Sequence, residues 1–269
     1  MTKYFWMQTK SMLKNPYLIF FSILFVEFWV FMWAFVFGTN IPPFEPAIRE
    51  YLGTAFGALL VLSLSSAASG ITMSLLYSSK SIRYVTKYTK LSPSRFFLEN
   101  LLSSLAVLGV ISLIMFLSVV LVFLGKFGML VLPANGPGLF LSIILGTLFM
   151  YTLSLFLNLL IVVLKAPKSA TFISFLPMML GFLPYMSLWI DFGVVAYISP
   201  FNSLTSVCYH FFSGNLPPTG NYLMDPRGAL MNMPLVVLSL LLWVILFVIA
   251  DIVLLKKMRG VGVDEIRVV

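Results

Sequence analysis

The chain has 269 residues, of which 60% are hydrophobic and 10% are charged, and its formal net charge is +8. Soluble domains average about 25% charged residues, so this composition excludes a soluble globular domain and predicts an integral membrane protein. The single cysteine, Cys208, excludes an intrachain disulfide and any metal site built from several cysteines.

The first sixteen residues, 1–16, predict an amphipathic helix that lies in the membrane interface. At 100° per residue one face is basic and the opposite face is mostly apolar, as in interfacial helices. The two faces consist of Lys3, Lys10 and Lys14, and of Phe5, Thr9 and Met12. Pro16 then changes the chain direction and opens the first span, and a disordered basic tail is the alternative. The apolar run that follows is too long for a cleavable signal peptide.

Six apolar segments after this helix are long enough to cross a bilayer. A hydrocarbon core about 30 Å thick requires roughly 20 apolar residues in a helix. The predicted spans lie near 17–38, 51–78, 100–125, 138–164, 169–190 and 234–255. The sequence therefore predicts an all-α polytopic membrane protein with a six-span transmembrane domain over 17–269.

The positive-inside rule sets the orientation of these spans. With the N-terminus in the cytoplasm, the cytoplasmic segments hold fourteen of the seventeen basic residues, and Arg49, Lys126 and Arg227 remain outside. We therefore expect a multi-pass protein of the plasma membrane with both termini in the cytoplasm. Topology and contact with anionic lipid then account for the net charge, so nucleic acid is not an expected partner.

A long outer insert, 191–233, separates the fifth and sixth predicted spans. Its stretch SPFNSLTSVCYHFFSGN predicts a short amphipathic or re-entrant helix. Irregular backbone at membrane depth is tolerated only against protein or water, so we expect this piece to pack on the spans. A mobile loop is the alternative.

Several kinds of site are absent from the sequence. It has no phosphate-loop motif G-x-x-x-x-G-K-[ST], so we do not expect this chain to bind ATP by itself. The one histidine, His210, does not provide enough ligands for a zinc site. It also lies too far outside to act as the base for Ser69 in an intramembrane serine protease. The stretch SAASG at 66–70, with Gly53 and Gly57 in a G-x-x-x-G spacing, instead predicts a face for close helix packing.

Two carboxylates fall within predicted spans. Glu27 lies near the middle of the first span, where a carboxylate is costly and indicates function by default. We weigh a role in a substrate pathway, with Asn158 of the fourth span as a candidate partner, against a buried structural Glu. Asp251 lies near the cytoplasmic end of the last span, where it is expected to snorkel or to pair with Lys256 or Lys257.

The cytoplasmic segment 80–93 predicts a short amphipathic helix between the second and third spans. Its basic residues recur at i, i+4 and i+7, and its apolar residues are offset from them. The two sets are Arg83, Lys87 and Lys90, and Ile82, Val85 and Tyr88. The helix is expected to end before Pro93, with Ser92 capping the third span.

This layout resembles the type-2 membrane subunits of ATP-binding-cassette exporters, the permeases of drug, lipid and polysaccharide export. The stretch KLSPSRFFLENLL is similar to the turn that ends their second cytoplasmic junction. The segment Phe175–Asn215 is similar to their proline-punctuated fifth span, outer helices and short helix ending in glycine, and the N-terminal helix ending in KNP fits as well. The chain departs from the family at FSGN, where many members carry a basic residue shortly before the glycine and where His210 is the nearest here.

The resemblance implies two such permease subunits, as a homodimer or heterodimer, around one pathway. Two separate ATPase subunits would bind ATP and Mg and drive transport, while this chain would carry no cofactor, no metal and no enzymatic activity. The segment 80–93 would be the coupling helix that enters a cleft of the ATPase. The contact residues implied are Ile82, Arg83, Val85, Lys87 and Tyr88, together with Lys10 and Lys14.

The leading hypothesis is an exporter permease whose Phe- and Met-rich spans suit a hydrophobic or amphipathic substrate. The runner-up is a proton- or ion-coupled secondary transporter with Glu27 as its proton site. A membrane enzyme is disfavoured, because no nucleophile–base pair or metal cluster is in reach. A membrane assembly subunit is a further alternative.

Overall fold

The computed structural model describes residues 3–88, 93–222 and 229–257, and within these ranges the chain is helical without strands. The elements are α1 (Lys3–Leu13), α2 (Pro16–Ile19), the π-helical turn η1 (Phe20–Leu24), α3 (Phe25–Phe35), the 3₁₀ turn η2 (Phe37–Asn40), α4 (Glu45–Tyr88), α5 (Pro93–Phe127), α6 (Gly136–Val163), the 3₁₀ turn η3 (Pro167–Ser169), α7 (Ala170–Leu180), α8 (Leu183–Met186), α9 (Val195–Ile198), α10 (Pro200–Ser213) and α11 (Met233–Lys257).

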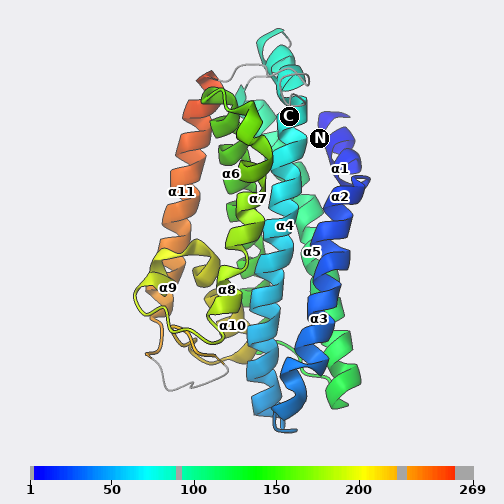
Figure 1. The fold of residues 1–269 in the computed structure, drawn as a ribbon, viewed down its shortest axis with the longest axis vertical. Coiled ribbons are helices and arrows are strands. Elements are labelled where there is room, and N and C mark those ends of the chain that lie inside the picture. The colour runs from blue at the N-terminus through cyan, green and yellow to red at the C-terminus, as the bar shows by residue number, and fades with distance from the viewer. Residues whose placement is uncertain (1–2, 89–92, 223–228, 258–269) are drawn as a thin grey trace.

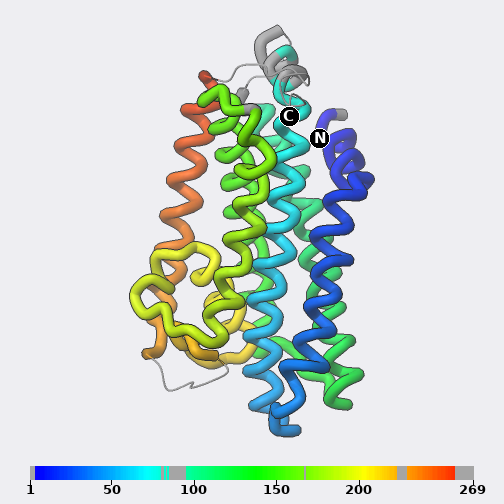
Figure 2. The backbone as a smooth tube through the Cα atoms, in the orientation of Figure 1, coloured from blue at the N-terminus to red at the C-terminus, as the bar shows by residue number. Residues whose placement is uncertain are grey.

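Five helical segments in the described residues are long and apolar enough to cross a membrane. They are Pro16–Asn40, Glu45–Ser79, Arg95–Phe127, Gly136–Val163 and Met233–Lys257. These correspond to the first, second, third, fourth and sixth spans predicted from the sequence. The helices form a long bundle in which α1 and the end of α11 lie at the same end (Figures 1 and 2).

The fifth predicted span, 169–190, is not one continuous helix. It is divided into α7 and the single turn α8, and the apolar segment Ala170–Met186 is shorter than the five others. Pro177 lies inside α7 and Pro184 begins α8. A proline inside a helix removes one backbone hydrogen bond and crowds the preceding turn, which explains why the apolar run is interrupted.

Helix α4 is the centre of the bundle, with α3 on one side and α7 on the other (Figure 1). In its apolar window 89% of the residues are buried inside the protein, whereas only 28% are buried in the first and last spans. A Cβ added at Gly57 would lie 2.9 Å from the carbonyl oxygen of Thr205 in α10. The predicted close packing at Gly53 and Gly57 is therefore confirmed, because both glycines face α10.

The predicted helix in the outer insert is confirmed as α10, and it packs on the spans. Its start is capped by Ser199, whose Oγ accepts a hydrogen bond from the backbone N of Asn202, and it ends at Gly214 with φ 83°. Leu204, Cys208 and Phe212 are fully buried. This helix is therefore held by the bundle and is not a mobile loop.

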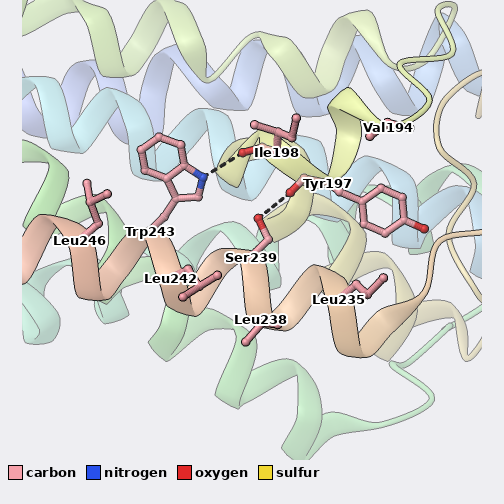
Figure 3. A pocket seen from close by; sticks show the side chains of 9 residues that line it. All are labelled: Val194, Tyr197, Ile198, Leu235, Leu238, Ser239, Leu242, Trp243 and Leu246. Carbon is pink, nitrogen blue, oxygen red and sulfur yellow. Dashed lines mark hydrogen bonds between the residues drawn. The ribbon is translucent and has the colours of Figure 1, made fainter.

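Helix α9 is fastened to α11 beside an apolar groove of about 640 Å³ (Figure 3). The Trp243 Nε1–H donates to the carbonyl of Ile198 at 2.9 Å, and the Ser239 hydroxyl donates to the carbonyl of Tyr197 at 2.5 Å. These bonds satisfy carbonyls at the C-terminal end of α9, which an isolated single turn would leave without helical partners. Residues of the last span thereby anchor the outer insert.

The predicted N-terminal helix is present as α1, and part of its apolar face covers protein. Phe5 and Met12 are buried against α5, and the Ser103 hydroxyl donates to the carbonyl of Phe5 at 3.1 Å. Lys10 and Lys14 are exposed on the other side. The helix is therefore docked on the third span.

Candidate functional site

A groove of about 530 Å³ runs along α4 between α2 and α7. Its lining combines hydroxyl groups with aromatic and apolar side chains. The lining residues are Asn15, Tyr17, Ser69, Gly70, Met73, Ser74, Tyr77, Ser78, Thr171, Ser174 and Phe175. A mixed surface of this kind suits a ligand that has both an apolar body and polar groups.

Helix α2 and the π-helical turn η1 pack directly on this face of α4. An added Cβ at Gly70 would make an ordinary van der Waals contact with Leu18 at 3.6 Å, which shows how near α2 lies. Farther along, the Ser63 hydroxyl donates to the carbonyl of Ser22 at 2.5 Å, within the π-helical turn η1. π-Helical turns recur at functional sites, and this one lies where the first span crosses α4.

The opposite wall of the groove is the interrupted helix α7. The backbone N–H of Met178 donates to the Ser69 hydroxyl of α4 at 3.2 Å. At Gly181 an added Cβ would fall 1.9 Å from Ser65 Oγ, so only glycine fits against α4 there. A hydroxyl of a neighbouring helix commonly compensates a helix broken by proline, which is the role that Ser69 takes beside Pro177.

An aromatic cluster joins α3 to α8 next to this wall. The Trp29 ring packs against Tyr185 with centroids 5.2 Å apart and against Phe182 at 6.1 Å, both edge to face. The Trp33 Nε1–H donates to the Tyr185 hydroxyl, whereas the buried Trp29 Nε1–H has no partner among the residues that the structure describes. Buried indole N–H groups usually find an acceptor, so Trp29 offers an unused donor within this cluster.

The structure gives Glu27 and Asn158 separate partners. The Ser118 hydroxyl of α5 donates to Glu27 Oε1 at 2.5 Å, and Asn158 Nδ2 donates to the carbonyl of Thr72 in α4 at 3.4 Å. No hydrogen bond in the described part of the chain joins the two, and neither lines the groove. Their expected pairing is therefore not observed.

The segment 80–88 is helical as expected, but it is the end of α4 and not a separate short helix. Ile82 is buried in the core cluster of its own chain. Its side chain is therefore packed within this chain, and its expected contact with an ATPase stays a prediction.

Other parts of the expected coupling segment lie outside what the structure describes. This holds for residues 89–92 and for the side chains of Arg83, Val85, Lys87 and Tyr88. The third span begins at Pro93, as predicted.

Asp251 departs most from its sequence-based interpretation. Its side chain is fully buried, and within the described residues it forms no ion pair with Lys256 or Lys257. The buried residues of α11 include Leu240, Val244, Phe247 and Asp251, at i, i+4, i+7 and i+11. This helical spacing was the available signal, because it places Asp251 on the face that packs into the bundle.

No protein-family model, curated protein or solved structure matches the chain. Fold and composition define a polytopic, all-helical membrane protein, and its function has to be argued from the residues themselves.

Proposed function

We propose that this chain is the permease subunit of a type-2 ATP-binding-cassette exporter that moves a hydrophobic or amphipathic substrate out of the cell. The groove on α4 is the observation that carries this proposal. It places four serines, one threonine and two tyrosines between the first span and an interrupted helix. A transport pathway needs such a surface beside a wall that is able to move. Among the described residues the hydrogen bonds between α7 and α4 are those from Met178 N–H to Ser69 Oγ and from the Ser174 hydroxyl to Met73 Sδ.

The proposal also specifies assembly. Six crossings, including α7–α8 as a short fifth, place both termini in the cytoplasm, in agreement with the common position of α1 and the end of α11 in the bundle (Figure 1). An ATPase subunit binds ATP and Mg in the cytoplasm and contacts the segment 80–93. A second permease subunit, identical or homologous, completes the pathway.

The first test concerns the partner. Tyr88→Ala removes an aromatic anchor, and truncation of such an anchor typically costs about 2 kcal/mol or more of binding, whereas rim charges such as Lys87 mainly alter association rates. Co-purification should therefore lose the ATPase with Tyr88→Ala and retain it with Lys87→Ala. Retention of the ATPase with full stimulation of its hydrolysis in both Tyr88→Ala and Val85→Asp contradicts the assignment of this segment.

The second test concerns the groove. Ser174→Trp fills it, and Leu141→Trp adds the same bulk to an exposed position of α6. With the ATPase in proteoliposomes, an amphipathic fluorescent dye should stimulate ATP hydrolysis in the parent and in Leu141→Trp but not in Ser174→Trp. Equal stimulation in all three proteins removes the groove from the pathway.

A proton-coupled secondary transporter is the second candidate, and it is favoured by one observation, the fully buried carboxylate of Asp251. It predicts dye movement by the purified chain alone, driven by a pH difference across the vesicle membrane. The exporter predicts none without the ATPase and ATP.

A further inference from the structure

Another pocket, of about 510 Å³, lies between the first turns of α4 and the last turns of α10, at the end of the bundle opposite α1 (Figure 1). We call it the outer pocket. Its polar and aromatic lining residues are Glu50, Tyr51, Thr54, Tyr209, Asn215 and Tyr222. None of them lines the groove between α2 and α7, so the outer pocket is a separate site.

The carboxylate of Glu50 is held in place in this pocket. The Asn215 Nδ2–H donates a hydrogen bond to Glu50 Oε1 at 2.5 Å. Asn215 is itself fixed, because its carbonyl oxygen accepts a hydrogen bond from His210 Nδ1 at 2.9 Å. Arg49, which precedes Glu50 in the sequence, pairs with Glu45 at 2.5 Å. The lining thus contains an oriented negative charge.

Two tyrosine rings form adjoining walls beside this carboxylate. The ring centroids of Tyr209 and Tyr222 lie 5.5 Å apart, and the ring planes are inclined by 65°. Tyr209 packs on the helix that carries Glu50, since a Cβ added at Gly53 would lie 3.4 Å from Tyr209 Cδ2. Gly53 follows Glu50 by three positions and therefore shares its face of α4. The carboxylate and the rings accordingly line one space.

The wall that carries Tyr222 is fixed by hydrogen bonds. The backbone N–H of Tyr222 donates to the carbonyl of Ser187 at 3.4 Å, and the Tyr222 hydroxyl lies 3.4 Å from the hydroxyl of Ser206 in α10. The backbone N–H of Thr219 donates to the carbonyl of Ala229 at 2.9 Å. A wall that is already ordered does not lose conformational freedom when a ligand binds.

A carboxylate beside aromatic rings is an arrangement that binds organic cations. A positive charge is attracted to the face of an aromatic ring, and quaternary ammonium groups are recognised in this way. Such a group has no N–H, so it needs no set of hydrogen-bond acceptors, and its methyl groups pack against the rings. A metal ion requires several ligand atoms, and the described ranges contain no group of three His, Cys, Asp or Glu side chains that could hold one.

We propose that the outer pocket binds a quaternary ammonium group. Glu50 supplies the opposite charge, and Tyr209 and Tyr222 supply the aromatic walls. A soluble choline-like cation and the choline headgroup of a membrane lipid present the same chemical group to this pocket. The site needs neither an ATPase nor transport, so it goes beyond the proposed function and is tested independently of it.

The first experiment measures the binding of radiolabelled choline to the full chain in nanodiscs of phosphatidylglycerol, a lipid without choline. The parent should bind choline saturably, and dimethylbutanol, the uncharged carbon analogue of choline, should compete at least about tenfold more weakly than unlabelled choline. Absence of saturable binding, or equal competition by the two compounds, overturns the proposal.

The charge of Glu50 is tested by a matched pair of variants. Glu50→Gln keeps an acceptor for Asn215 but removes the charge, so it should weaken choline binding roughly tenfold. The control is Glu45→Gln, which neutralises a carboxylate on the first turn of α4 that does not line the pocket. It should bind choline like the parent, and equal affinities of the two variants overturn the proposal.

The aromatic wall is tested at Tyr222. Tyr222→Ala removes the ring and should weaken choline binding roughly fivefold or more. Tyr222→Phe keeps the ring and loses only the hydroxyl, so it should bind choline more tightly than Tyr222→Ala. Equal affinities of these two variants overturn the assignment of the ring as a wall of the site.

Two further measurements identify the occupant. In nanodiscs of phosphatidylcholine, loss of choline binding assigns the lipid headgroup as the source of the ligand, whereas unchanged binding assigns a soluble cation. Arg227 of the outer insert is a cation of this chain that would compete for the same pocket. Tighter choline binding by Arg227→Gln than by the parent would show that the chain fills the pocket with its own side chain, and it overturns the proposal.

Discussion

Gly57→Ala tests the close contact between α4 and α10. The added methyl group would lie 2.9 Å from the carbonyl oxygen of Thr205 and 3.1 Å from its Cγ2. The first of these atoms belongs to the backbone of a fully packed helix and cannot rotate away, so α10 has to shift. Overpacking of this kind costs about 1–3 kcal/mol.

Gly109→Ala serves as the control variant, and the buried thiol of Cys208 serves as the reporter of unfolding. Gly109→Ala places the same methyl group where no atom lies within 4 Å, so this variant should keep the parental stability or exceed it slightly through better helix propensity. Burial raises the pKa of the Cys208 thiol to about 12, so the thiol should react with a maleimide dye only when α10 separates from the bundle.

The assay is thermal unfolding followed by dye labelling of Cys208. For a chain of this size 1 kcal/mol corresponds to roughly 2–4 °C, so Gly57→Ala should lower the midpoint by about 5 °C. Thr205→Ser removes Cγ2 but leaves the carbonyl, and it should restore only part of the loss. Equal midpoints for Gly57→Ala and Gly109→Ala would refute the packing argument.

Three further predictions concern topology, transport and pH. In a background without Cys208, a membrane-impermeant thiol reagent added to intact cells should label Asn221→Cys and miss Thr86→Cys; labelling of the latter contradicts the orientation. Glu27→Gln should fold and assemble but transport the amphipathic dye at a changed rate, and parental transport by both Glu27→Gln and Glu27→Leu would show that the residue is not part of a pathway. The hydroxyl of Thr219 and the backbone N–H of Gly193 donate to Asp191 and lower its pKa, so they stabilise the outer insert at neutral pH and less as pH falls below 4. Limited proteolysis of the insert should accelerate at acid pH in the parent, and Asp191→Asn should remove that change.

The sequence predicted best those features that depend on one helix at a time. Length and apolar content located five of the helices, and the position of Phe5 and Met12 on one helical face predicted α1. The spacing of Gly53 and Gly57 indicated close helix packing but did not indicate which helix packs there. That partner is α10, about 150 residues farther along the chain, and no local pattern encodes such a distant contact.

The errors arose where tertiary contacts decide the outcome. Asp251 was assigned to the interface because two lysines follow it in sequence, yet helix rotation turns it inward while Lys256 remains exposed. The fifth span was treated as continuous because its apolar content hides the interruption near Pro177, which Ser69 of α4 compensates from outside the segment.

The central position of α4 has a consequence for how the protein is made. Of the five segments long enough to cross the membrane, α4 is the least apolar, and it is also the one most enclosed by the others. During synthesis it enters the bilayer before α5, α6, α7 and α10 exist to cover it. Several of its hydroxyls bond to carbonyls of the same helix, as Ser66 does to Leu62 and Thr72 to Ala68, so these groups are satisfied while lipid still surrounds them. The helix can thus remain stable in lipid until the later helices are synthesised. Because it is made before them, the later helices then pack around it.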